Sequence, residues 1–169
     1  MNYLTLALRL IHIIAGVFWV GGALTAHFFV SPTLSALGAQ GQPFAQHFMS
    51  KSRFSQRISA AAGLTILAGA GLYWLDSDGL TSAWMKSGAG VGFTLGAVFA
   101  LIGFVFGILN GVNFRALASA TAQVQGQPTK EQQAQIQSIQ KRLAVSSPLT
   151  AYPLIVAVVF MAVARYMTF

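Results

Sequence analysis

Four long apolar runs constrain this chain more than any other feature of its sequence. They cover residues 4–30, 54–75, 88–111 and 147–168, and each reaches the roughly 20 residues that a helix needs to cross a bilayer. Charged residues make up only 8% of the 169 residues, whereas a soluble domain usually carries about 25%. So few charges cannot cover a globular surface. The sequence therefore predicts an all-α, multi-pass membrane protein of one domain, with the lipid bilayer as its solvent.

Helix-breaking and turn residues separate the runs. Pro32 lacks the N–H that would continue the first helix, so we expect that helix to end at residues 31–32. The turn sequence of residues 76–79 ends the second run. Pro148 and Pro153 lie inside the fourth run, whose first half we expect to be bent.

Two connections have helical patterns of their own. Residues 43–54 carry Phe44 and Phe48 at helical spacing, which predicts a short helix at the membrane surface. Residues 129–143 are rich in glutamine and have an apolar stripe, which predicts an amphipathic cytoplasmic helix that leads into the fourth run.

Basic residues are distributed unequally between the two sides. Seven of them lie in or next to the connections after the first and third runs, and the opposite side carries three: Arg9, Lys86 and Arg165. Because basic loops stay in the cytoplasm, both termini and the loop of residues 76–86 are predicted to be non-cytoplasmic. The net charge of +7 then indicates contact with anionic headgroups rather than with nucleic acid.

Small residues form one face of the third run. They recur at steps of three or four residues: Gly88, Gly92, Gly96, Ala100, Gly103, Gly107 and Gly111. Such a face usually lets a neighbouring helix approach closely, which favours an antiparallel four-helix bundle. It could equally form the interface of a homodimer or larger membrane complex. A less common alternative is that it accepts the flat face of a macrocycle.

The first run carries the candidate site residues on one helical face: Arg9, His12, Gly16, Trp19 and His27. Ionisable side chains are costly inside a membrane and are functional candidates by default, and His12 is the best of them. His12 and His27 lie about 22 Å apart along a helix, so they cannot bind one metal. A second ligand for His12 must come from another helix or from an exogenous molecule.

An antiparallel fourth run brings Met161 and Arg165 near the depth of His12. Methionine is a known second ligand for haem iron and also suits Cu(I), so Met161 is the candidate partner. Arg9 and Arg165 are candidates for binding propionates. The alternatives are that His12 hydrogen-bonds a neighbouring helix, that Met161 fills the core, and that the arginines reach the headgroups.

A second metal site is a weaker hypothesis. His27 and His47 both belong to the cytoplasmic end, where Met49, Asn110 or Asn113 could join them. The chain has no cysteine, which removes thiolate ligands and thiol nucleophiles. Its sequence also has no phosphate-binding loop and no pair of intramembrane carboxylates, which argues against an ATPase or a proton-coupled carrier.

Residues 9–22, RLIHIIAGVFWVGG, resemble the opening helix of the copper-resistance protein D (CopD-like) superfamily of small bacterial membrane proteins. They are also similar to the HemJ type of protoporphyrinogen oxidase, in which a basic residue three before the histidine recurs. The end of the fourth run, residues 161–166, looks like the close of four-helix members of this group. The resemblance implies a four-helix bundle in a bacterial inner membrane, with a role for His12 in binding haem b or copper.

Three functions therefore stay open. The first is a haem-b-binding membrane protein in redox or porphyrin chemistry, with His12 as axial ligand and with Trp19 and Gly16 beside it. The second is a cofactor-free helix-packing subunit of a larger membrane complex. The third is copper handling. Because the second to fourth runs contain no histidine, ligation of haem by two histidines within one bundle is not expected.

Overall fold

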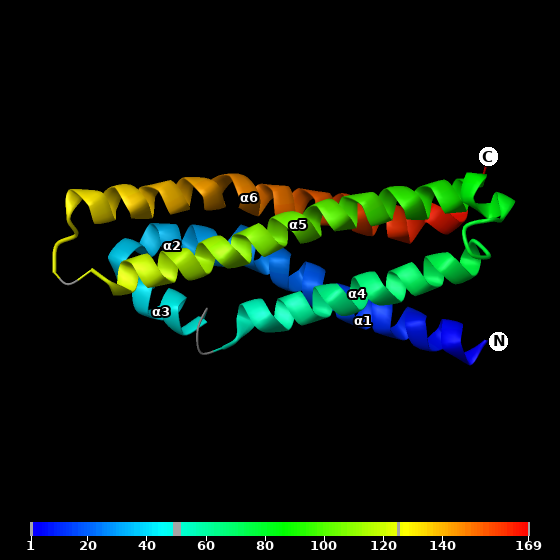
Figure 1. Cartoon of the computed structure of the whole chain (residues 1–169), viewed down its shortest axis with the longest axis horizontal. Helices are drawn as coiled ribbons and strands as arrows, with labels where there is room; N and C mark the ends of the chain where they lie inside the picture. The colour runs from blue at the N-terminus through cyan, green and yellow to red at the C-terminus, as the bar shows by residue number, and fades with distance from the viewer. Residues whose placement is uncertain (1, 49–51, 125, 169) are drawn as a thin grey trace.

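The computed structural model describes residues 2–48, 52–124 and 126–168 and places them in helices joined by short loops (Figure 1). Four helical stretches are long and apolar enough to cross a membrane: Tyr3–Leu37, Phe54–Asp76, Gly88–Ala122 and Lys130–Tyr166. The predictions of an all-helical chain and of four membrane-length helices are therefore confirmed.

The first stretch continues past its predicted end. Helix α1 (Tyr3–Thr25) passes into a π-helical turn at Ala26–Val30 and then into α2 (Ser31–Leu37). Pro32 lies in the first turn of α2, where a missing N–H costs little, so the predicted end at residues 31–32 is wrong. The helix ends instead at Gly38, whose φ of +53° is a conformation that glycine adopts readily.

The connection to the second stretch contains only short helical turns. A 3-10 turn at Gly38–Gly41 precedes α3 (Gln42–Gln46), which is shorter than the surface helix predicted over residues 43–54. The rings of Phe44 and Phe48 stack at 5.7 Å. Met49 and Lys51 lie outside the described residues.

The remaining helices are α4 (Phe54–Asp76), α5 (Gly88–Ala122) and α6 (Lys130–Val163). A 3-10 turn at Ala83–Lys86 precedes α5, and another at Ala164–Tyr166 follows α6. The predicted helix of residues 129–143 and the fourth apolar run are one continuous helix, α6, which contains both Pro148 and Pro153. Neighbouring helices can stabilise prolines inside membrane helices.

The start of α6 is fixed locally by a capping box. The side chain of Thr129 accepts the N–H of Gln132, and the side chain of Gln132 accepts the N–H of Thr129. This reciprocal pair satisfies two backbone donors that an unprotected helix start would leave without partners. The helix therefore begins well before the apolar run.

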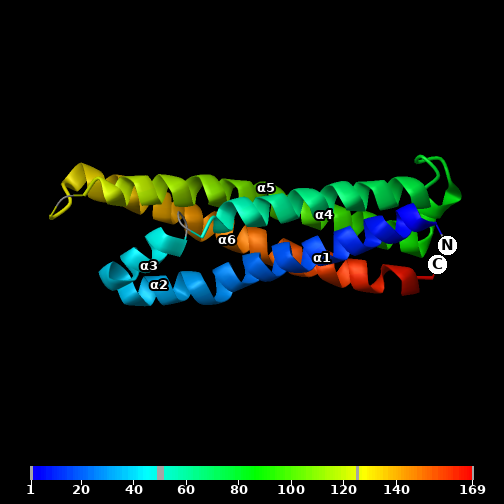
Figure 2. The same ribbon diagram turned by 90° about the horizontal axis from the view of Figure 1, so that it is seen from below.

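Both termini lie at one end of the molecule, and consecutive long helices run in opposite directions along its long axis (Figures 1 and 2). Helix α4 has 23 residues, or about 34 Å, close to the thickness of the hydrocarbon core. The α1–α2 stretch and α5 have 35 residues each, or about 52 Å. They extend beyond α4 at the end opposite the termini, which we call the distal end.

The helices pack as two pairs, α1 with α4 and α5 with α6. Trp19 of α1, only 3% exposed, connects the pairs. It belongs to a core cluster with Ala61 and Ala62 of α4 and Leu154 of α6, and its ring meets the ring of Phe104 of α5 edge-on at 6.1 Å.

Between Gly92 and Gly103, the glycine face of α5 is covered by α6 and by the 3-10 turn that follows it. A β-carbon on Gly92 would lie 2.9 Å from the Cα of Ala164, and one on Gly103 would lie 2.7 Å from the Cγ of Leu154. A side chain at Gly92 would push the two backbones apart, and one at Gly103 would displace the Leu154 side chain. The small-residue face therefore receives a neighbouring helix of the same chain.

Candidate functional site

His12 lies in the interface between α1 and α4. Its Nδ1 is 2.8 Å from the main-chain oxygen of Thr65. Because a carbonyl oxygen can only accept a hydrogen bond, Nδ1 carries the proton and donates it. The ring rests on Gly69, where a β-carbon would lie 2.8 Å from the imidazole Cε1 and 2.9 Å from Nδ1. Gly69 therefore makes the room that the imidazole occupies.

The second nitrogen of His12 remains available. Nε2 makes no hydrogen bond within the described residues. Within the described residues, the only inaccessible side-chain polar atom without a hydrogen-bond partner is Ser82 Oγ. Nε2 of the half-buried His12 also has no partner, so it must be accessible at the protein surface. An imidazole that donates from Nδ1 to a carbonyl presents its Nε2 lone pair, which is the usual arrangement of a histidine that binds a metal.

The other candidates of the first helix lie in different surroundings. A β-carbon on Gly16 would be 3.5 Å from Cγ2 of Thr65, so Gly16 faces the α4 residue that holds His12. Trp19 is in the core that connects the helix pairs. Arg9 is exposed, about one turn before His12.

The candidates of the fourth stretch contact a different helix. Met161 is half-buried, and its Cε would lie 3.0 Å from a β-carbon on Gly96 of α5. Arg165 is exposed on the 3-10 turn that follows α6. The described contacts thus place Met161 between α5 and α6, and His12 between α1 and α4.

His27 occupies the π-helical turn. Its Nδ1 is 2.8 Å from Oγ of Ser147 on α6, and its ring lies 4.7 Å from that of Phe28 and 5.8 Å from that of Tyr152. His47, which follows α3, is exposed and does not line the cavity at His27. No three histidine, aspartate or glutamate side chains of the described residues come together as a metal-binding group.

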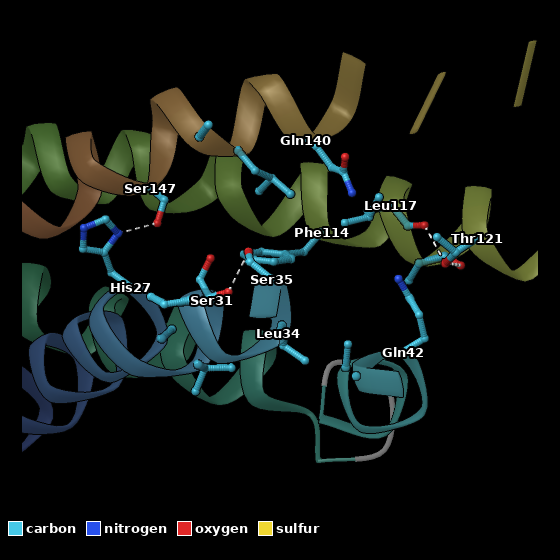
Figure 3. Close-up of a pocket in the computed structure, with 18 of the residues that line it drawn as sticks. His27, Ser31, Leu34, Ser35, Gln42, Phe114, Leu117, Thr121, Gln140 and Ser147 are labelled. Carbon is cyan, nitrogen blue, oxygen red and sulfur yellow. Dashed lines mark hydrogen bonds between the residues drawn. The ribbon is translucent and has the colours of Figure 1, made fainter. Parts of the chain in front are cut away.

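His27 and Ser147 lie between two cavities. The larger, about 780 Å³, opens at the distal end between α2 and α3 on one side and α5 and α6 on the other (Figure 3); we call it the distal cavity. The smaller, about 100 Å³, lies among the four long helices and reaches Trp19; we call it the inner cavity. Ala26, His27, Phe114 and Ser147 line both.

A polar cluster joins α5 to α6 beside the inner cavity. Asn110 Nδ2 donates to Thr150 Oγ1 at 2.8 Å, and Ser146 Oγ donates to Asn110 Oδ1. We expected Asn110 near His27 and His47 but gave no role to Ser146, Ser147 or Thr150. Their spacing could have indicated a shared role, because Ser146 and Thr150 lie four residues apart at the start of the fourth apolar run and so share a helix face.

Comparison of the chain with models of known protein families, with curated proteins and with solved structures finds no match. The family resemblance of residues 9–22 therefore stays a hypothesis, and the site is argued from the contacts of this chain alone.

Proposed function

We propose that this protein binds haem b through Nε2 of His12 and takes part in redox or porphyrin chemistry. One observation carries the proposal: the hydrogen bond from Nδ1 to the carbonyl of Thr65, which fixes the imidazole and leaves Nε2 free. Placing a histidine inside a membrane helix costs free energy, so such residues are usually functional. The space left by the missing side chain of Gly69 holds the His12 ring in position. Bound haem would supply a centre for one-electron transfer.

Some of the expected haem environment fits and some does not. His12 fits as one ligand to the iron, and the exposed Arg9 would be available to bind an anionic propionate. The glycine face of α5 does not fit a porphyrin, because Leu154 and Met161 of α6 and Ala164 of the 3-10 turn after it already pack against it. The proposal therefore uses neither that face nor Met161, and leaves the second axial position to an exogenous group or a second copy of the chain.

The proposed setting is a bacterial inner membrane, crossed by one antiparallel four-helix bundle with both termini outside. The bias of seven basic residues against three supports this orientation. The length of α4 supports a membrane boundary near Phe54 and another near Asp76. The distal end would then face the cytoplasm.

A cofactor-free subunit of a larger membrane complex is the second candidate. It is favoured by the close fit between α5 and α6 and by the hydrogen bond of His12 to Thr65, since both also serve helix packing. In this alternative His12 connects two helices and binds nothing. No contact of the described residues favours copper handling over these two.

Absorption spectra of the full-length protein in mild detergent distinguish the candidates. We expect a Soret band that shifts on reduction with dithionite, iron close to one equivalent, and loss of both in His12→Ala. The matched control is His27→Ala, which removes the other histidine of the same helical stretch and should keep the spectrum. Met161→Leu should keep it as well.

Two results would reject haem binding at His12. One is a wild-type protein without haem even when haem is supplied during expression, which would favour the packing subunit. The other is an unchanged spectrum in a folded His12→Ala variant. Loss of the spectrum in Met161→Leu would instead establish Met161 as a ligand.

A further inference from the structure

We propose that the distal and inner cavities form a binding site for an uncharged amphiphile, whose hydrogen-bonding head is held by His27 and Ser147. This site is separate from His12 and does not depend on the proposed haem. The argument rests on the local structure at His27, on the chemistry of the cavity walls, and on the depth of the site.

The π-helical turn gives His27 its position. Within Ala26–Val30 the backbone bonding shifts by one residue, so that the N–H of Ser31 donates to the carbonyl of Ala26. Such turns are rare and are frequent at functional sites. The turn lies at the point where α1 meets α6, and there Nδ1 of His27 reaches Oγ of Ser147 (Figure 3).

One nitrogen of His27 is left for a ligand. Nδ1 pairs with Ser147, whereas Nε2 makes no hydrogen bond within the described residues. If Ser147 donates to Nδ1, Nε2 carries the proton and can donate; with the other tautomer, Nε2 accepts. The pair can therefore bind a carbonyl or a hydroxyl head.

The walls of both cavities are polar in places but carry no fixed charge. Among the described residues, no lysine, arginine, aspartate or glutamate lines either cavity, and His27 is their only titratable group. The distal cavity combines hydroxyl and amide groups, such as Ser31, Ser35 and Gln140, with apolar side chains such as Leu34 and Leu117. A fully charged head would lose its hydration without gaining a partner, so the walls select an uncharged one.

The size and depth of the site suit an amphiphile. A volume of about 780 Å³ lies within the roughly 300–1,000 Å³ of ordinary ligand sites. His27 and Ser147 share the inner cavity with Phe54 and Ser55, which begin the membrane-length helix α4. The pair therefore lies at the level of the proposed membrane boundary, and the two cavities on either side of it both combine apolar side chains with hydroxyl and amide groups.

Trp19 provides a direct reporter of binding. It lines the inner cavity, and the chain has only two other tryptophans, Trp74 and Trp84, which Phe can replace. The double variant of the full chain, in lipid nanodiscs, is titrated with the monoglyceride of dibromostearic acid, whose bromines quench tryptophan, and with decylubiquinone. Ionised dibromostearate at pH 9 has the same tail as the monoglyceride and serves as the charged comparison.

Two pairs of variants test the assignment. His27→Ala removes the hydrogen bond to the head of the amphiphile and should weaken its apparent affinity about three- to tenfold, the effect of one hydrogen bond. His47→Ala changes an exposed histidine and should leave the affinity unchanged. Ala118→Phe places an aromatic ring in the distal cavity and should weaken binding more than His27→Ala does, whereas Ala116→Phe, on the exposed side of the same helix, should leave it unchanged.

We expect saturable quenching of Trp19 by at least one uncharged probe, and the probe that binds identifies the source as a glyceride lipid or a quinone. Quenching that does not saturate, or that falls equally in the control variants, would overturn the site. Binding of dibromostearate as tight as that of the monoglyceride would overturn the uncharged class. A failed haem test at His12 would not affect any of these results.

Discussion

Met161 packs directly against Gly96, with its Cε 3.0 Å from the place where a β-carbon on Gly96 would be. The sequence suggested Met161 as a haem ligand and Gly96 as part of a face that could accept a porphyrin, but the two residues contact each other. The thioether side chain fills the space left by the missing side chain of the glycine, as methionine commonly does in cores. This contact is why the proposed haem site rests on His12 alone.

The contact of α5 with α6 and with the 3-10 turn after α6 predicts a cost of adding a methyl group that depends on the position. In Gly92→Ala the new β-carbon would lie 2.9 Å from the Cα of Ala164, so the backbones must separate and stability should fall by about 1–3 kcal/mol. Gly107→Ala is the control, because its β-carbon would meet only Cγ2 of Thr150 at 3.7 Å. Thermal unfolding in detergent measures both, and equal effects would contradict the packing.

The position of His12 predicts that two glycines of α4, Gly69 and Gly63, respond differently to replacement by alanine. Gly69→Ala would place a β-carbon 2.8 Å from the imidazole Cε1, so the ring should move away from Thr65 and any haem bound at Nε2 should be held less tightly. Gly63→Ala has nothing within 4 Å and should leave stability unchanged or slightly higher, since alanine favours the helix. Unfolding curves and reduced-minus-oxidised spectra of the two variants provide the comparison.

Asn110 should stabilise the pairing of α5 with α6. Asn110→Ala removes a donor to Thr150 and an acceptor from Ser146, and should cost about 1–2 kcal/mol, the upper range for polar contacts between membrane helices. Asn113→Ala changes a half-buried asparagine for which no side-chain hydrogen bond is present in the described chain. It should have little effect, and a larger loss in Asn113→Ala would refute this role of Asn110.

The proposed orientation can be tested directly because the native chain has no cysteine. Ala83→Cys introduces an exposed thiol before α5, and Ser138→Cys introduces one on the distal part of α6. A membrane-impermeant maleimide should label the first in intact bacterial cells, and the second only after the membrane is opened. The reverse pattern would place the termini in the cytoplasm.

The sequence by itself determined the four membrane-length helices. Apolar length and scarcity of charge are local properties, and a bilayer requires every backbone polar group within it to be paired, which a helix achieves alone. The small-residue face of α5 was likewise visible, because helical spacing places Gly92 and Gly96 on one side.

Only the tertiary structure decided which faces meet. Helical spacing does not fix how a helix is rotated or which neighbour it contacts, so Met161 could not be assigned to Gly96 rather than to His12. The pairing of His27 with Ser147 joins residues 120 positions apart and depends on the π-helical turn before Pro32. That turn contacts α6 through His27, and α6 continues through Pro148 and Pro153 while packed against α5. Local rules for proline do not include such contacts between helices.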